Sequence, residues 1–94
     1  MEHCILAKFK PEVTDKQALF EQIRSMFSDA EQISGIHGAK IYTNCIDRSN
    51  RYDVMIVLDM EKDALAAWDR SALHRRWKET FGELLEKKTI FDQE

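Results

Sequence analysis

The sequence predicts one α+β domain of ferredoxin-like order, in which strand, helix, strand, strand, helix and strand follow one another. Two segments carry strand patterns: side chains alternate over residues 3–10, and a nearly continuous apolar run lies within residues 52–60. Two other segments carry apolar residues at helical spacing. Because the chain has 94 residues and no linker, repeat or low-complexity tract, we expect a single domain over residues 1–94 with a four-stranded antiparallel sheet.

The first half of the chain predicts a strand followed by an amphipathic helix. The strand over residues 3–10 ends at Pro11, which has no N–H for a sheet ladder. The helix is expected from residue 15 to about residue 32, and Thr14 and Gln17 have the spacing of a capping box at its start. Its apolar stripe consists of Leu19, Phe20, Ile23, Met26, Phe27 and Ala30.

The second half predicts three strands and a pair of helices. Residues 39–45 alternate weakly, residues 47–51 are polar and turn-like, and residues 52–60 form the strongest strand. Asp63 and Ser71 are expected to cap a short helix and a longer one. The last strand is expected over residues 89–92. The buried stripe of the longer helix consists of Leu73, Trp77, Phe81, Leu84 and Leu85.

The third strand is apolar at both odd and even positions, which is typical of a strand covered on both faces. Two helices cover only one face of a four-stranded sheet. If Ile5, Phe9, Val54, Ile56 and Leu58 face the helices, the open face carries Cys4, Leu6, Met55 and Val57. Each buried aliphatic side chain stabilises by about 1.5–3 kcal/mol. We therefore expect a homodimer in which two open sheet faces pack into an α+β barrel.

Charge and cysteine content exclude several classes of partner. The net charge of −3 argues against a nucleic-acid or anionic-membrane surface, and the basic residues within 70–78 are interpreted as a solvated helix face. The N-terminus lacks the pattern of a signal peptide, and no apolar segment has the length of a membrane span. With only Cys4 and Cys45, which we expect about 9–10 Å apart as free thiols, a cytoplasmic location is predicted.

Short motifs along the chain resemble the stress-responsive A/B barrel (Dabb) family of dimeric α+β barrels. Residues 3–14, HCILAKFKPEVT, resemble the family's histidine-led opening strand. The pairs Gly35-Ile36 and Tyr52-Asp53 and the residue Asn44 stand where the family has similar ones. Residues 71–74, SALH, replace its H-P-x-H motif, and residues 90–92, IFD, match its closing strand. The resemblance covers nearly the whole chain and implies a homodimer.

The same resemblance suggests candidate catalytic residues. His74 aligns with the histidine that acts as base in a plant polyketide cyclase of the family, and His3 aligns with a second pocket histidine. A neutral imidazole is a suitable general base near neutral pH. The chain departs from the cyclase at Trp68, which replaces a tyrosine, and at Val54, which replaces a histidine. A ligand pocket would be lined by Ile5, Ala7, Val54, Ile56, Trp68, Trp77, Phe81 and Ile90.

Three hypotheses about function follow. The leading one is a homodimer that binds a small apolar or phenolic ligand, without a cofactor, in a cavity between sheet and helices. The second is a small-molecule enzyme, cyclase- or lyase-like, with His74 as base and His3 assisting. The third is a haem- or metal-binding barrel, although His3, His37 and His74 lack the close spacing of metal ligands, so no metal site is predicted. For Trp68, Trp77 and Phe81 the alternative is core packing.

Overall fold

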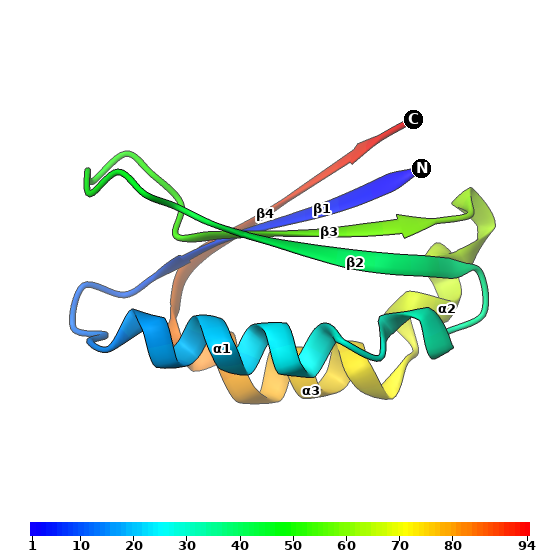
Figure 1. Cartoon of the computed structure of the whole chain (residues 1–94), viewed down its shortest axis with the longest axis horizontal. Helices are drawn as coiled ribbons and strands as arrows, with labels where there is room; N and C mark the ends of the chain where they lie inside the picture. Colours follow the sequence, from blue (N-terminus) through cyan, green and yellow to red (C-terminus); the bar gives the residue numbers. More distant parts are fainter.

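The computed structural model describes all 94 residues and has two layers, a sheet and a layer of helices (Figure 1). The strands lie in the order β2-β3-β1-β4, and every neighbouring pair is antiparallel. This confirms the predicted ferredoxin-like fold. The elements are β1 (Glu2–Phe9), α1 (Lys16–Phe27), β2 (Ile36–Thr43), β3 (Val54–Met60), α2 (Leu65–Asp69), α3 (Ala72–Phe81) and β4 (Leu85–Gln93).

The register of the sheet decides which side chains face the helices, because residues that pair directly across strands share a face. One row faces the helices and crosses the sheet as Ile41, Ile56, Ile5 and Ile90. The adjacent row lies on the open face and crosses as Tyr42, Met55, Leu6 and Thr89. Of the two possible orientations of the sheet, the observed one places Ile5, Phe9 and Val54 towards the helices.

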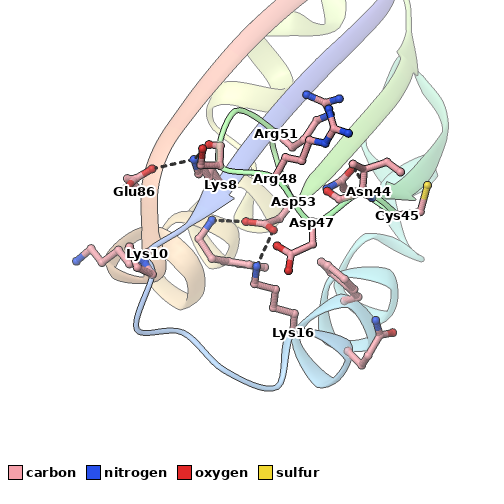
Figure 2. A pocket seen from close by; sticks show the side chains of 16 residues that line it. Lys8, Lys10, Lys16, Asn44, Cys45, Asp47, Arg48, Arg51, Asp53 and Glu86 are labelled. Carbon is pink, nitrogen blue, oxygen red and sulfur yellow. Dashed lines mark hydrogen bonds and ion pairs between the residues drawn. The ribbon is translucent and has the colours of Figure 1, made fainter.

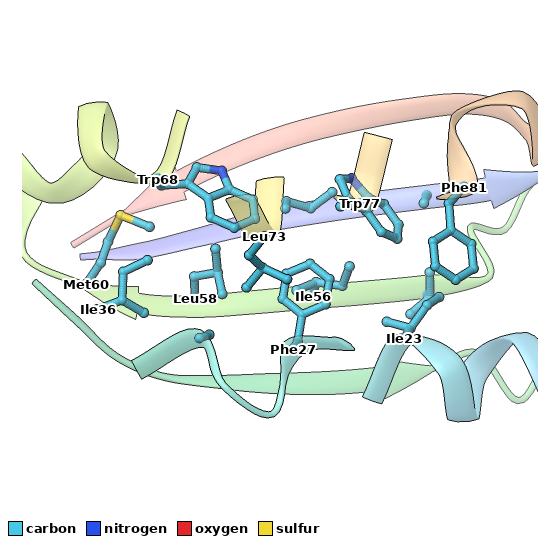
Figure 3. Packing of buried hydrophobic residues seen from close by; sticks show 14 of the residues in the cluster. Ile23, Phe27, Ile36, Ile56, Leu58, Met60, Trp68, Leu73, Trp77 and Phe81 are labelled. Carbon is cyan, nitrogen blue, oxygen red and sulfur yellow. The ribbon is translucent and has the colours of Figure 1, made fainter. Parts of the chain in front are cut away.

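The core lies between the layers and contains 17 buried residues. Figure 3 shows side chains from the helices pointing towards β1 and β3. Trp77 is central: its ring centroid lies 5.8 Å from that of Phe27 on α1 and 5.1 Å from that of Phe81 on α3. Aromatic contacts of this kind add to the free energy gained by burial. The core stripes predicted for the two long helices are thus largely confirmed, with Leu84 and Leu85 half-buried.

The first helix is shorter than the sequence predicts, and it has a different cap. Asp15, not Thr14, is the N-cap: it adopts a left-handed conformation with φ of 51°, and its carboxylate accepts from the N–H of Ala18. The helix ends at Phe27 because the Ser28 hydroxyl donates to the Ser25 carbonyl, a side-chain bond that competes with helix continuation. A 3₁₀ turn over Ala30–Gln32 follows and still buries Ala30.

Strand boundaries also differ from the expectation. β2 begins at Ile36 rather than residue 39, because Ile36 pairs with Met60 and is buried. β4 is more than twice as long as expected because it pairs with β1 from Leu85 to Gln93, although residues 86–88 are charged. Asp63 makes no capping bond to α2, since it lies within a 3₁₀ turn. Ser71 caps α3 as predicted, with its Oγ accepting from the His74 N–H at 3.0 Å.

Candidate functional site

The two candidate histidines both contact Trp68. His3 lies on β1 and faces the helix layer, where it is only 5% exposed. Its ring centroid is 6.4 Å from that of Trp68, and the ring of His74 is 4.7 Å from the same indole. No hydrogen bond joins the two histidines. The structure therefore brings both predicted site residues to one end of the core, with an aromatic side chain in contact with each.

His3 has a partner that sequence reasoning missed. Its Nδ1 lies 2.5 Å from Oδ1 of Asp92, which occupies the neighbouring position on β4. Because a carboxylate accepts, Nδ1–H donates, and this selects the tautomer whose Nε2 is free to accept a proton. The two residues are 89 positions apart. Asp92 is identified only by the register in which the first and last strands pair, and the alternation pattern does not specify that register.

His74 is held by the start of its own helix. Its backbone N–H donates to the Ser71 Oγ, and its Nδ1–H donates to the carbonyl oxygen of Asp69 at 3.1 Å. Its side chain is partly exposed. These bonds satisfy orphan groups where the short helix α2 ends and α3 begins. The geometry suits a structural role for the ring, although its Nε2 has no protein partner.

Most of the residues expected to line a ligand pocket are buried and pack in the core of one protomer. Trp68, Trp77 and Phe81 are 0–1% exposed, which leaves no water-sized void beside them. The aliphatic members of that set on β1 and β3 are equally buried: Ile5, Ala7, Val54 and Ile56. Ile90 is the exception at 45% exposed, because it lies on the edge strand beyond the reach of the helices. Within one protomer, side chains fill the space between sheet and helices.

A shallow apolar groove of about 510 Å³ lies on the open face of the sheet. Of its residues, Tyr42 and Phe91 are 49% and 60% exposed and were not among those the sequence analysis placed on this face. The alternation in the second and fourth strands, continued to these positions, would have found them. The groove is lined by Glu2, Cys4, Leu6, Tyr42, Met55, Val57, Thr89, Phe91 and Gln93.

Cys4 lies in this open-face groove with a protonated thiol. Burial raises the pKa of Cys4 above its usual value of 9.0, and the carboxylates of Glu2 and Asp92 raise it further. All three causes disfavour the thiolate, which is the reactive form. Cys45 is exposed beyond the end of β2, and both cysteines are free.

Other classes of site have no donor set in this chain. No three histidine, cysteine, aspartate or glutamate side chains gather in a way that would hold a metal ion. The third histidine, His37, is exposed, and its Nε2 lies 3.0 Å from Oε1 of Glu61. None of the helices combines the length and hydropathy needed to cross a bilayer.

Solved structures with the same fold include two bacterial proteins described as dimeric, ferredoxin-like and of unknown function. The one from Bacteroides fragilis is 14% identical, with a TM-score of 0.81 over 99% of this chain and 93% of that chain. The one from Thermobifida fusca is 20% identical, with a TM-score of 0.78 over 96% of this chain and 85% of that one. A hydroxynitrile lyase from Passiflora edulis is 16% identical, with a TM-score of 0.71 over 96% and 87%.

At such identities the structural likeness shows the fold alone. A comparison with curated protein sequences found no significant match. Family assignment comes from a different finding, the match of residues 1–94 to the profile of the Stress Responsive A/B Barrel Domain, known as Dabb. Because this match spans the whole sequence, the chain belongs to the stress-responsive A/B barrel domain family.

Proposed function

We propose that this protein acts as a homodimer in which two open sheet faces pack together into an eight-stranded barrel. The observation that carries the proposal is the apolar open-face groove described above, which no element of the chain covers. Leu6 and Met55 lie at its centre and are half-buried, and Phe91 at its edge is largely exposed. A second copy removes these side chains from water at a gain of about 25 cal/mol per Å² of apolar surface.

Two further features support the same occupant. The sheet has two long unpaired edges, β2 and β4, and closing such edges into a barrel removes them from solvent. The structural relatives from Bacteroides fragilis and Thermobifida fusca are themselves described as dimeric. A two-fold pair is the commonest arrangement in which identical surfaces bury each other.

The packed interior favours an assembly role over ligand binding between sheet and helices. A ligand in that space would have to displace Trp68 or Trp77, each 1% exposed. The contacts at stake are large, because truncating a core Phe or Trp to Ala costs about 3–5 kcal/mol. We therefore propose that the dimer itself, rather than a cavity inside one protomer, is the functional unit. A cytoplasmic location remains a prediction from the cysteine content.

Sedimentation of purified protein across micromolar concentrations tests the proposal. We expect a dimer, and we expect Phe91→Glu to shift it towards monomer without unfolding it, because Phe91 is already 60% exposed in one chain. Gln22→Glu adds the same charge on an exposed position of α1 and should leave the dimer intact. A stable wild-type monomer, or equal effects of the two variants, would overturn the proposal.

A second candidate function, catalysis by a histidine base, is favoured by the His3–Asp92 pair. The carboxylate holds the ring with Nε2 free, and this is the arrangement that orients a general base in many enzymes. No side-chain nitrogen is buried without a partner, so Nε2 of His3 reaches solvent. A protein of the same fold is named as a hydroxynitrile lyase. On this hypothesis His3 takes a proton and Asp92 stabilises the imidazolium that forms.

Cleavage of an aromatic cyanohydrin to aldehyde and cyanide provides the test of this second candidate. If His3 is the base, His3→Gln removes turnover while circular dichroism shows an intact fold. His74→Gln is the matched comparison, because it changes the histidine whose bonds suit a structural role. Turnover that is lost only in His74→Gln would transfer the role to that residue. No turnover by the wild type would reject this substrate class.

A further inference from the structure

A second concave region, separate from the open face, lies at the end of the molecule where the β2–β3 loop overhangs the start of α1 (Figure 2). This cleft has a volume of about 780 Å³ and is lined by residues from β1, α1, the loop and β4. Its size is within the range of about 300–1,000 Å³ found for small-molecule sites. Neither the homodimer nor the histidine chemistry proposed above uses it.

The walls of the cleft are joined by specific bonds. Asp53, at the end of the loop, accepts from the Phe9 N–H at 2.8 Å and from the Lys16 Nζ at 3.0 Å, so it links the loop to β1 and to α1. The Lys8 Nζ donates to the carbonyl of Ser49 and forms an ion pair with Glu86 at 3.5 Å. These contacts connect four separate segments and hold the cleft in one shape.

The charge balance of the cleft is opposite to that of the whole chain. Five lining side chains are basic and three are acidic, whereas the protein carries a net charge of −3. Lys8 and Lys16 are neutralised by Glu86 and Asp53. The remaining charges, on Lys10, Asp47, Arg48 and Arg51, form no ion pair.

Arg48 and Arg51 are the most informative of these unpaired groups. Figure 2 shows both on the loop that borders the cleft, and the Arg51 Nη1 donates only to the amide oxygen of its neighbour Asn50. Two like charges that line one cleft make its potential more positive, and a bound anion would offset them. The planar guanidinium groups of Arg48 and Arg51 have N–H donors spaced to match the oxygens of a carboxylate or phosphate. Asp47 is the one unpaired carboxylate in the cleft, and its charge opposes the binding of such a ligand.

The cleft also offers apolar surface beside these charges. Ile46 is 46% exposed on the loop, and Phe20 closes the bottom of the cleft from α1. Phe20 stacks against Phe9 with ring centroids 6.1 Å apart, so the base of the cleft is the end of the core. A simple inorganic ion would leave this apolar surface wet, whereas a ligand with a small hydrocarbon body would cover it.

We propose that this cleft binds a small organic anion, with its carboxylate or phosphate on Arg48 and Arg51 and its apolar body against Ile46. The excess positive charge is too small for a nucleic acid, which needs an extended basic surface. Lys10 also lines the cleft, and its charge attracts the anion from a distance without contacting its head group.

Titration of the isotope-labelled dimer with benzoate, phenyl phosphate and neutral benzyl alcohol, followed by amide NMR, tests this proposal. We expect at least one of the two anions to shift the amides of residues 8–10 and 44–51, with an affinity that falls as salt rises. Benzyl alcohol should bind at least about tenfold more weakly, because it lacks the charge that the arginines recognise. Which anion binds more tightly identifies the head group.

Variants decide whether the arginines are responsible. The double variant Arg48→Gln and Arg51→Gln should weaken anion binding by about tenfold or more. The double variant Arg70→Gln and Arg75→Gln removes the same charge from exposed positions outside the cleft and should bind as the wild type does. Shifts spread over the whole surface, equal binding of benzyl alcohol, or an unchanged affinity in the cleft variant would each overturn the proposal. All four substitutions leave the open face and the His3–Asp92 pair untouched.

Discussion

The two faces of the sheet are built from the same four strands but carry different kinds of surface. On the helix-covered face, Ile5, Ile56 and Leu58 are 0–2% exposed. On the open face, the adjacent residues Leu6 and Met55 are half-buried, and Phe91 is 60% exposed. A shift of one position along a strand changes the face, so neighbours in sequence experience different environments. The comparison shows that the helices of the same chain close one face, while no element of the chain covers the other.

The single buried polar side chain, on the covered face, makes the same point. His3 is the only buried polar residue of the chain, and it is paired with Asp92. The open face, by contrast, carries Asp59 at its end without an ion pair. Burial of a polar group is tolerated only when its hydrogen bonds are satisfied. A polar group on the covered face therefore needs a protein partner, whereas Asp59 at the end of the open face stays hydrated.

The largest expected difference between the faces comes from the neighbours Ile56 and Met55. Ile56→Ala should lower the free energy of unfolding by about 2–5 kcal/mol at every protein concentration, because it leaves a cavity in a closed core. Met55→Ala should act mainly through association, so its cost should shrink as dilution favours monomer. Urea unfolding at several protein concentrations measures both. A Met55→Ala cost as large as that of Ile56→Ala and independent of concentration would break the comparison.

Two glycines, one packed against the helix layer and one on the open face, allow the same comparison for substitutions at glycine. Gly35 has a φ of +86°, and an added Cβ would lie 2.6 Å from the Cβ of Ala64 in the helix layer. Gly35→Ala should therefore cost about 2–4 kcal/mol, from left-handed backbone strain and overpacking. Gly38 pairs with Asp59 on the open face, and a Cβ added there would meet no atom within 4 Å. Gly38→Ala should stabilise by about 0.5–1 kcal/mol. Thermal unfolding distinguishes the two, and equal effects would contradict the packing described.

The His3–Asp92 pair should show a smaller coupling. A double-mutant cycle with His3→Gln and Asp92→Ala is expected to give about 1–2 kcal/mol, because His3 is buried but the carboxylate is 39% exposed. Asp59→Ala, an exposed carboxylate on the other face, should change the free energy of unfolding by less than about 0.5 kcal/mol. Additive effects of the His3 and Asp92 substitutions would mean that the pair does not stabilise the covered face.

The smallest predicted effect is a pH dependence at Cys4. Since its pKa is raised in the folded state, the folded chain retains the thiol proton where the unfolded chain loses it. This contribution to stability is complete below the unfolded value near 9.0 and is lost as pH rises through the higher folded value. Compared with Cys4→Ala, the wild type should therefore lose more stability as the pH is raised above 9.0. Cys45→Ala, at an exposed thiol, is the control, and parallel pH profiles for all three proteins would contradict the prediction.

The element order and the alternation along each strand follow from periodicity, while the choice of the face that meets the helices and several boundaries do not. The strand over residues 85–93 is longer than its alternation suggests, because pairing with β1 supplies backbone bonds that its charged side chains do not predict. Asp15 caps the first helix in place of the predicted Thr14, because the capping-box pattern does not predict an N-cap with a left-handed backbone. His3 and His74 could be chosen from sequence, but their common neighbour Trp68 and the partner Asp92 depend on how distant segments meet.

By itself, the sequence determined which residues alternate and which follow helical spacing, and therefore the fold class and the apolar character of the open face. These properties are local, because each depends on residues only a few positions apart. Only the tertiary structure shows that Trp68, Trp77 and Phe81 pack tightly between sheet and helices, and that Arg48 and Arg51 border a cleft. Cavities and polar pairs arise where segments far apart in the chain approach, and their geometry depends on packing in three dimensions.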